Sequence, residues 1–438
     1  MARRKRITPD DVRERLAARP SRVPTSTLLR SYHAARAMLD GGRAALLSPG
    51  VDPARLEGVV RSLGELKGVA MKLGQILSYV DDGLPDEARA VLGVLQTWSP
   101  PTRYQEIEAT IRADLGARAQ PLLDRLSRFP VASASIGQVH RGRLPDGSLV
   151  AVKVRHPGVD EAIRADFRAA WGGLALVGLL LPGADVSTAA AEAQAAFLEE
   201  CDYRLEATRQ RRFAELWAHD ARLTIPRVRD EWCGARVLTS AWQQGATYEA
   251  LLSSSPPQAD RDRAGETLFD FYVGSLYRYA LFNAYPHPGN LLFERGGHVT
   301  ILDHGCVREL APEVVRSWAT LSRGVRADDA GEVRRALVAL GAVDPGVGRA
   351  YDVTRELLRA FYGPTLEAGR RRVRSGLPRS MRELAAGKRD VLRLHLPGKL
   401  LFLLRARFGL YAVLSRLGAE VDLHARESAL CDEALARG

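Results

Sequence analysis

The stretch Ala284-Tyr285-Pro286-His287-Pro288-Gly289-Asn290, followed by Ile301-Leu302-Asp303-His304-Gly305, decides how this chain is interpreted. Asn290 and Asp303 lie thirteen residues apart, and the segments between them predict a β-hairpin around Gly296-Gly297. Amide and carboxylate oxygens of this kind are the ligands that Mg²⁺ prefers in proteins. The spacing with a hairpin between the two residues therefore predicts a magnesium site made by Asn290 and Asp303.

The same stretch has the spacing of a protein-kinase catalytic loop, with one departure. Such a loop places a catalytic Asp five residues before a Mg²⁺-binding Asn, and a second metal-binding Asp follows in a D-F-G turn. Here Tyr285 stands at the position of the catalytic Asp, and His304 stands in place of the Phe. A phenol with a pKa near ~10 does not accept a proton at neutral pH as a carboxylate does. We therefore expect a site for Mg·ATP that lacks the usual general base.

Three further features are typical of groups that contact nucleotide phosphates. Lys153 lies on an Ala-Val-Lys strand, where a kinase lysine contacts the α- and β-phosphates. The small side chains of Ala134-Ser135-Ile136-Gly137-Gln138 would let backbone N–H groups approach phosphate, and a plain turn between strands is the alternative. His287 either reaches the γ-phosphate or stabilises its own loop, and the sequence leaves both interpretations open.

The acidic segment at residues 199–206 offers a carboxylate partner for Lys153. On a helix that turns about 100° per residue, Asp202 and Glu206 share a face while Glu200 points elsewhere. One carboxylate is expected to pair with Lys153 and another to serve a different partner. An exposed acidic helix face is the alternative.

The composition bounds the class of protein. The 438 residues are 46% hydrophobic and 26% charged, as in ordinary soluble globular proteins. Four scattered cysteines form no metal-ligand spacing, so a reducing cytoplasm is the expected setting. A net charge of +11 would attract nucleic acid, anionic lipid or acidic protein as binding partners through its electrostatic field. The sequence has no clusters of interleaved aromatic and basic residues, which would favour nucleic acid among these partners.

No targeting or membrane-spanning segment is predicted. The basic N-terminus lacks the apolar run of a signal peptide. The longest uncharged apolar run, residues 169–184, falls short of the ~20 residues that span a bilayer, so a buried core helix is expected there. We therefore predict a cytoplasmic protein, with peripheral membrane association as an additional hypothesis.

Periodicity divides the chain into four predicted regions. These are a basic helical segment (1–50), a helical extension (51–125), a kinase-like N-lobe (126–245) and a helical C-lobe (246–438). Strands before helices predict an α+β, protein-kinase-like two-lobed fold with a small β-rich N-lobe, a larger helical C-lobe and a helical N-terminal extension. The predicted elements include helices at 56–80 and 104–116 and strands at 130–132, 138–144, 149–154, 224–228, 236–240, 291–293 and 299–302.

Together these motifs resemble the UbiB/AarF family of atypical kinases, which is linked with coenzyme Q biology. Lys72-Leu73-Gly74-Gln75 is similar to the family's K-x-G-Q signature, and residues 134–140 are similar to its Ala-rich loop. Glu200-Cys201-Asp202 is similar to its E-x-D signature. The resemblance implies that Glu206 is the partner of Lys153.

The resemblance also implies a kinase-like fold whose N-terminal extension lays Lys72 and Gln75 over the active site. Glu200 or Asp202 would engage that extension. Such an arrangement would hinder protein substrates and favour ATP hydrolysis or small lipid-like targets. Family members ordinarily carry Asp where this chain has Tyr285.

The sequence thus predicts an atypical kinase-like protein that binds Mg·ATP between two lobes. Slow ATPase activity, or phosphotransfer to a small or lipid-like molecule, is the expected activity. A quinone-related molecule and an anionic membrane surface are further candidate partners, whereas nucleic acid is not expected. The alternative is a pseudokinase, a nucleotide-responsive scaffold at a membrane surface, because Tyr285 replaces the catalytic Asp.

The segment at residues 399–417 has two interpretations. It is rich in Leu and Phe but carries Arg405, Arg407 and Arg416, which are costly in hydrocarbon. A buried core helix is one interpretation, and a basic helix lying on an anionic membrane surface is the other.

Overall fold

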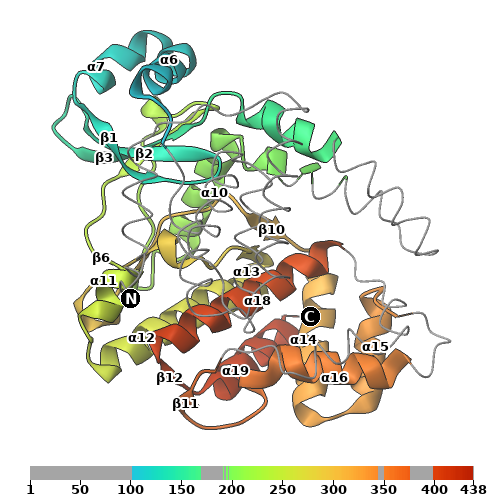
Figure 1. Cartoon of the computed structure of the whole chain (residues 1–438). Coiled ribbons are helices and arrows are strands. Elements are labelled where there is room, and N and C mark those ends of the chain that lie inside the picture. The colour runs from blue at the N-terminus through green and yellow to red at the C-terminus, as the bar shows by residue number, and fades with distance from the viewer. Residues whose placement is uncertain are drawn as a thin grey trace, which may run out of the picture. The chain divides into compact units, whose positions relative to one another are not determined.

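The computed structural model describes residues 101–168, 197–343, 350–374 and 398–437, together with residues 191, 194 and 195. The predicted helix at 56–80, with Lys72 and Gln75, lies outside the described residues, as do the segment 1–50 and the run 169–184. The chain forms two compact units, whose elements are labelled in Figure 1. Unit 1 holds the described residues up to Arg212 and Pro226–Gln243, and unit 2 holds Phe213–Ile225 and the described residues from Gln244 onward.

Unit 1 is built on a four-stranded antiparallel sheet in the order β1-β2-β3-β5. The strands are β1 (Leu126–Ser133), β2 (Gly137–Arg143), β3 (Leu149–Arg155) and β5 (Val237–Ala241). The helical elements include α6 (Tyr104–Leu115), η1 (Gly116–Arg118), α7 (Ala119–Leu123) and the first part of α10 (Tyr203–Leu216), with the short turn η2 (Asp230–Trp232). Residues 159–168 are helical as well. The strands predicted at 130–132, 138–144, 149–154 and 236–240 are thereby confirmed.

Alternation along β3 separates the core from the site. Val150, Val152 and Val154 are buried and pack in one cluster with Ile107 and Ile111 of α6. Because successive side chains of a strand point to opposite faces, Lys153 lies on the other face of the sheet. The valines therefore anchor the strand while leaving Lys153 on the face opposite α6.

Unit 2 combines short strands with long helices. A four-stranded sheet in the order β4-β9-β8-β6 is formed by β4 (Leu223–Thr224), β9 (Val299–Ile301), β8 (Leu291–Phe293) and β6 (Ala246–Thr247). Two-stranded pairs join β7 (Leu281–Asn283) to β10 (Val307–Glu309), and β11 (Arg371–Arg372) to β12 (Glu420–Val421). In the predicted strand 224–228 only Thr224 belongs to β4, because Pro226 has no N–H to extend the ladder.

Helices supply most of unit 2, and the predicted α+β, kinase-like fold class is confirmed. They are α11 (Tyr248–Ser253), α12 (Gln258–Phe269), α13 (Ser275–Tyr279), α14 (Pro312–Ala327), α15 (Ala330–Ala339), α16 (Ala350–Tyr362), α18 (Gly398–Leu417) and α19 (Leu423–Ala436). A π-helical turn, η3 (Asp270–Gly274), joins α12 to α13, and the short turns η4 (Pro288–Asn290), η5 (Arg295–Gly297) and η6 (Gly363–Thr365) complete the unit. Within the described residues, no helix has the length and apolarity needed to cross a membrane.

Helix α18 is a core helix, as the first of the two interpretations predicted. Leu403, Leu410 and Leu414 are buried in the main cluster of unit 2, and α18 packs along α12 (Figure 1). Arg407 is 4% exposed and forms an ion pair with Glu427 of α19, which is fully buried. The Arg407 charge is therefore accommodated inside the protein, as a core helix requires, whereas the Arg416 side chain is 56% exposed.

Loss of the Glu427 charge should destabilise the protein strongly. Glu427 Oε1 accepts hydrogen bonds from Tyr277 Oη at 3.0 Å and from Ser322 Oγ at 2.8 Å, besides its bond with Arg407. Breaking one partner of a buried pair leaves the other charge uncompensated, so Glu427→Gln should lower the free energy of unfolding by about 3 kcal/mol or more in urea titrations. Removing both charges, with Arg407→Met added, should cost less than the single change.

The exposed pair Arg112–Glu108 on α6 provides the control, because Arg112→Ala should shift the free energy of unfolding by no more than about 0.5 kcal/mol. A Glu427→Gln variant as stable as the native protein would contradict this account of the core.

Candidate functional site

The register of one hairpin places Asn290 and Asp303 together. Strands β8 and β9 pair with Leu291 opposite Ile301, and the Leu302 N–H donates a hydrogen bond to the Asn290 carbonyl at 2.9 Å. Asn290 is the last residue of η4 and therefore enters the hairpin directly opposite Leu302. Asp303 follows Leu302, so the amide and the carboxylate lie at the same end of the ladder.

A residue that the sequence analysis did not single out, Asn283, fixes this end of the hairpin. Its Nδ2 donates to the carbonyl of Asp303 at 2.7 Å, and its Oδ1 accepts from the Tyr285 N–H at 2.9 Å. Asn283 ends β7 and is 1% exposed. One buried side chain thus joins the loop that carries Tyr285 to the turn that carries Asp303. In the sequence, the position of this polar residue at the end of the apolar strand Leu281-Phe282 could have indicated its role.

The turn after Asp303 keeps its shape although His304 replaces Phe. The Gly305 N–H donates to Asp303 Oδ1 at 2.8 Å, which closes a local turn. The His304 ring is fully buried, with ring centroids 5.5 Å from Phe213 and 6.4 Å from Phe271. An imidazole thus occupies an aromatic packing position, and the Asp303 carboxylate remains on the turn.

His287 holds its loop through one ring nitrogen. Its Nδ1 accepts a hydrogen bond from the Gly289 N–H at 3.0 Å, so in the neutral ring the proton resides on Nε2. Burial lowers the pKa of His287 to about 4, and the nearby Asp303 carboxylate opposes this shift. The ring is therefore neutral at pH 7. The loop-stabilising interpretation has direct support, while contact with a γ-phosphate stays a prediction.

Tyr285 is held by two neighbours. The Arg405 guanidinium of α18 lies over its ring, 4.5 Å from the centroid, and the His287 ring lies 5.2 Å away at 31°. Burial raises the pKa of the phenol well above its ordinary value, although Arg405 opposes the shift. The phenol is consequently neutral at physiological pH and unsuited to act as a general base.

In unit 1, Lys153 is paired with Glu206 of α10. Lys153 Nζ lies 2.7 Å from Oε1 and 2.9 Å from Oε2, and Nζ is 5.1 Å from the centroid of the Tyr203 ring. Glu206 is 1% exposed, whereas the Lys153 side chain is 18% exposed. The carboxylate thus holds the ammonium at a partly accessible position on the sheet.

The other two acidic residues of this segment lie in different environments. Asp202 is exposed, and its Oδ1 accepts from the Arg204 N–H at 3.0 Å at the start of α10. Glu200 is buried, at 8% exposure. Their predicted engagement of Lys72 and Gln75 stays a prediction, since those two residues lie outside the described part of the chain.

The small-residue loop forms a tight turn between β1 and β2. The Ala134 N–H donates to the Gly137 carbonyl at 2.8 Å, with Ser135 and Ile136 between them. A Cβ on Gly137 would lie 2.7 Å from the Val154 carbonyl oxygen, closer than real contacts allow. The strands therefore approach each other only because residue 137 is glycine.

The side chain of Gln138 forms hydrogen bonds with other residues of unit 1. Its Oε1 accepts from the Thr102 N–H at 2.7 Å, and its Nε2 lies 2.9 Å from His140 Nε2. The residue is 1% exposed. Although it was predicted to bind the cofactor, its side chain is occupied in the core, and any phosphate contact from this loop must come from the preceding turn.

The residues of the hairpin end fit a magnesium–nucleotide complex. Among the described residues, Asn290 Nδ2 is buried without a hydrogen-bond partner. The orientation of the Asn290 amide is therefore not fixed by a hydrogen bond from its nitrogen. The described residues contain no cluster of three or more His, Cys, Asp or Glu that would form an all-protein metal cage. Mg²⁺ usually takes one or two protein ligands and completes its shell with phosphates and water, which matches the donor set of Asn290 and Asp303.

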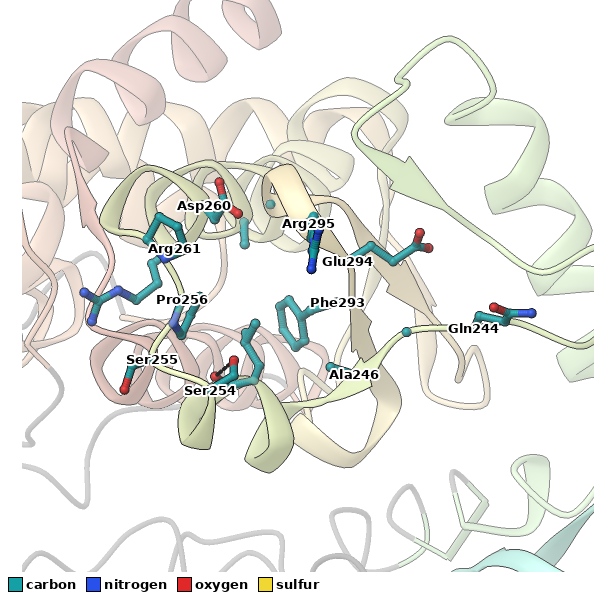
Figure 2. Close-up of a pocket in the computed structure, with 15 residues that line it drawn as sticks. Gln244, Ala246, Ser254, Ser255, Pro256, Asp260, Arg261, Phe293, Glu294 and Arg295 are labelled. Carbon is teal, nitrogen blue, oxygen red and sulfur yellow. Dashed lines mark hydrogen bonds between the residues drawn. The ribbon is translucent and has the colours of Figure 1, made fainter.

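A separate pocket of about 700 Å³ lies in unit 2. Figure 2 shows Phe293, Pro256 and Arg261 among its lining, which comes from residues 244–246, from α11 and the loop after it, from the first half of α12, and from β8 with the β8–β9 turn. The lining includes none of the predicted site residues. The pocket and the Asn290–Asp303 end of the hairpin are therefore distinct features of the unit.

Comparison with known proteins gives consistent matches. A family profile described as the ABC1 atypical kinase-like domain matches residues 94–337, more than half of the chain. The mitochondrial atypical kinase COQ8 of Saccharomyces cerevisiae is 26% identical over 318 residues, covering 69% of this chain and 63% of that protein. The mitochondrial atypical kinase COQ8B of Rattus norvegicus is 32% identical over 269 residues, covering 61% of this chain and 50% of that protein. The chain thus spans between half and two thirds of these relatives.

A solved structure is also similar. It is described as the complex of Rv3197 with erythromycin, from Mycobacterium tuberculosis. The similarity has a TM-score of 0.60 and 28% sequence identity, and it covers 83% of this chain and 92% of that chain.

The Asn283 bridge should contribute measurably to stability. Asn283→Ala removes two buried hydrogen bonds, each worth about 1 kcal/mol net, and should lower the free energy of unfolding by about 2–3 kcal/mol in urea titrations. Thr300→Val is a matched control, because Thr300 is 1% exposed and its hydroxyl has no partner among the described residues. That variant should unfold at a urea concentration equal to or above the native value. Equal losses in both variants would refute the bridging role.

His287 should make stability depend on pH. Its pKa of about 4 in the folded protein lies below the ~6.5 of an unfolded chain, so between these values the unfolded state binds more protons. Stability is therefore lost as the pH falls through that window. Relative to His287→Asn, which keeps an acceptor for Gly289, the native protein should lose about 2 kcal/mol more between pH 7 and pH 5. Parallel pH profiles of the two proteins would disprove this.

Proposed function

Since this chain belongs to the family of ABC1 atypical kinase-like domains, we propose that it binds Mg·ATP and turns it over slowly without an aspartate base. The family predicted from the motifs is confirmed by the match. The observation that supports the proposal most is the hairpin register, which brings the side chains of Asn290 and Asp303 to one end, while Tyr285 supplies a neutral phenol at the position expected for the base. The proposal therefore combines the predicted metal ligands, which are retained, with a general base, which is missing.

Each residue has a definite part in this proposal. Lys153, oriented by Glu206, binds the α- and β-phosphates, and the backbone of residues 134–137 adds N–H donors. Asn290 and Asp303 bind magnesium, which neutralises phosphate charge when it is present. Phosphoryl transfer depends mostly on positioning and charge neutralisation, so these groups support turnover without a base. The absence of the base removes a factor of about 10²–10⁴ in rate.

The proposed acceptor is water or a small molecule. A lipid-like or quinone-related hydroxyl compound is the acceptor class that the family resemblance suggests. One argument for an anionic membrane as a partner no longer holds, because α18 is a core helix with Arg407 paired inside the protein. Localisation in the cytoplasm stays a prediction, and the matched relatives are named as mitochondrial.

A pseudokinase is the second candidate, and the surroundings of Tyr285 favour it. The half-buried ring lies beside His287 and under the Arg405 guanidinium, so the base position is filled by a packed side chain. A protein of this kind would bind nucleotide and respond by a conformational change. Both candidates require magnesium binding by Asp303, and only the first requires product.

The deciding experiment measures Mg·ATP hydrolysis by the native protein, Tyr285→Asp and Asp303→Asn. We expect slow native turnover that Asp303→Asn abolishes, and a gain of about 10²-fold or more in Tyr285→Asp, because a carboxylate restores the base. Nucleotide affinity is measured in parallel with a fluorescent ATP analogue.

Turnover only in Tyr285→Asp, with native binding intact, would establish the pseudokinase. Native binding that is unaffected by Asp303→Asn, or that is absent, would refute the magnesium–nucleotide site itself.

A further inference from the structure

A fully buried histidine of unit 1, His156, contacts the loop between β1 and β2. It directly follows β3 and is 0% exposed. Its ring Nε2 lies 3.1 Å from the Ala134 carbonyl oxygen, and its backbone N–H donates to the Ile136 carbonyl at 2.9 Å. One residue thus binds two carbonyl groups of the small-residue loop, one through its ring and one through its backbone.

The hydrogen-bond partners of the His156 ring determine which nitrogen carries the proton. A carbonyl oxygen only accepts, so Nε2 donates to Ala134. In the neutral ring Nδ1 then accepts, and its partner is the Thr102 hydroxyl at 2.8 Å. Thr102 is itself held by Gln138, whose Oε1 accepts from its N–H at 2.7 Å and whose Nε2 donates to its carbonyl at 3.3 Å. A buried chain of polar groups therefore aligns the ring on the Ala134 carbonyl.

The contact with Ala134 determines the direction of one backbone donor. The His156 ring is bonded to Thr102, which lies directly before α6, so it is on the α6 side of the sheet, whereas Lys153 is on the opposite face. The peptide between Ala134 and Ser135 is trans, as are all peptide bonds of the described residues, so its C=O and N–H point in opposite directions. Because the carbonyl is directed at His156, the Ser135 N–H is directed toward the Lys153 face.

We propose that His156 is a positioning residue that orients the Ser135 N–H toward the phosphates of a bound nucleotide. This inference rests on the proposed function, in which Lys153 binds the α- and β-phosphates on the same face of the sheet. Backbone N–H groups bind phosphate more tightly when their direction is fixed in advance, because less ordering is then needed on binding. His156 itself does not touch the nucleotide, and it acts only through the Ala134–Ser135 peptide.

The test compares two polar variants of His156 by isothermal titration calorimetry of the purified full chain with Mg·ADP. This probe carries the α- and β-phosphates and is not consumed by hydrolysis. His156→Gln has an amide N–H donor that reaches the position of Nε2, so its affinity should stay within about twofold of the native value. His156→Asn reaches only the position of Nδ1 and cannot donate to Ala134. Its affinity should fall roughly tenfold, as expected for one lost hydrogen bond to a charged phosphate.

Thr239→Val is the matched control for the loss of a buried hydrogen bond in unit 1. Thr239 is fully buried in β5, and its hydroxyl donates to the Trp232 carbonyl of η2 at 2.7 Å. We expect this variant to lose stability in urea titrations, as His156→Asn does, and to keep native affinity for Mg·ADP. If His156→Asn does not fold, Thr102→Val takes its place. It removes the hydroxyl that aligns the ring and should weaken Mg·ADP binding by about threefold or more.

The outcomes separate this inference from the proposed function. A native protein that binds neither Mg·ADP nor Mg·ATP refutes the proposed function, and this inference with it. Native binding with equal affinities in His156→Gln and His156→Asn, or with native affinity in Thr102→Val where that variant is used, overturns the role of His156 alone. An equal loss in Thr239→Val also overturns it, because general destabilisation would explain both losses. A loss in His156→Asn, or in Thr102→Val in its place, that His156→Gln and Thr239→Val do not share supports the positioning role.

Discussion

The hydrogen bond from Leu302 N–H to the Asn290 carbonyl is the constraint on which the candidate site depends. A hairpin register admits no small adjustment, because a slip of one residue moves every side chain to the other face. With Leu291 opposite Ile301, Asn290 and Asp303 must emerge at one end. The two predicted metal ligands are therefore brought to one end of the hairpin by backbone pairing.

A second layer of bonds makes this end rigid from outside the hairpin. Asn283 joins the Tyr285 backbone to the Asp303 carbonyl, and β7 pairs with β10 so that Asn283 lies opposite Val307. The strand before the loop and the strand after the turn are thus neighbours. The loop and the turn are thereby held by one ladder, although more than twenty residues separate these strands in the sequence.

Sequence periodicity predicted the elements of secondary structure that depend on neighbouring residues. The strands at 149–154 and 291–293 and the helix at 104–116 agree with β3, β8 and α6, because alternation and helical spacing are visible within a few residues. Asn283, Arg405 and the buried role of Gln138 were not predicted, since each depends on partners that are distant in sequence. Arg405 meets Tyr285 across 120 positions, and an arginine on an apolar helix gives no indication of which ring it will contact.

The tyrosine at the base position is compatible with a folded site because the surrounding groups accept a neutral ring. A carboxylate there would face Arg405 and would pair with it, whereas the phenol stacks under the same guanidinium through its π face. The neutral phenol offers no charge to pair with, so Arg405 keeps its full positive charge beside residue 285. In this chain the exchange of Asp for Tyr alters more than proton transfer, since it also leaves a permanent cation against residue 285 with no carboxylate there to pair with.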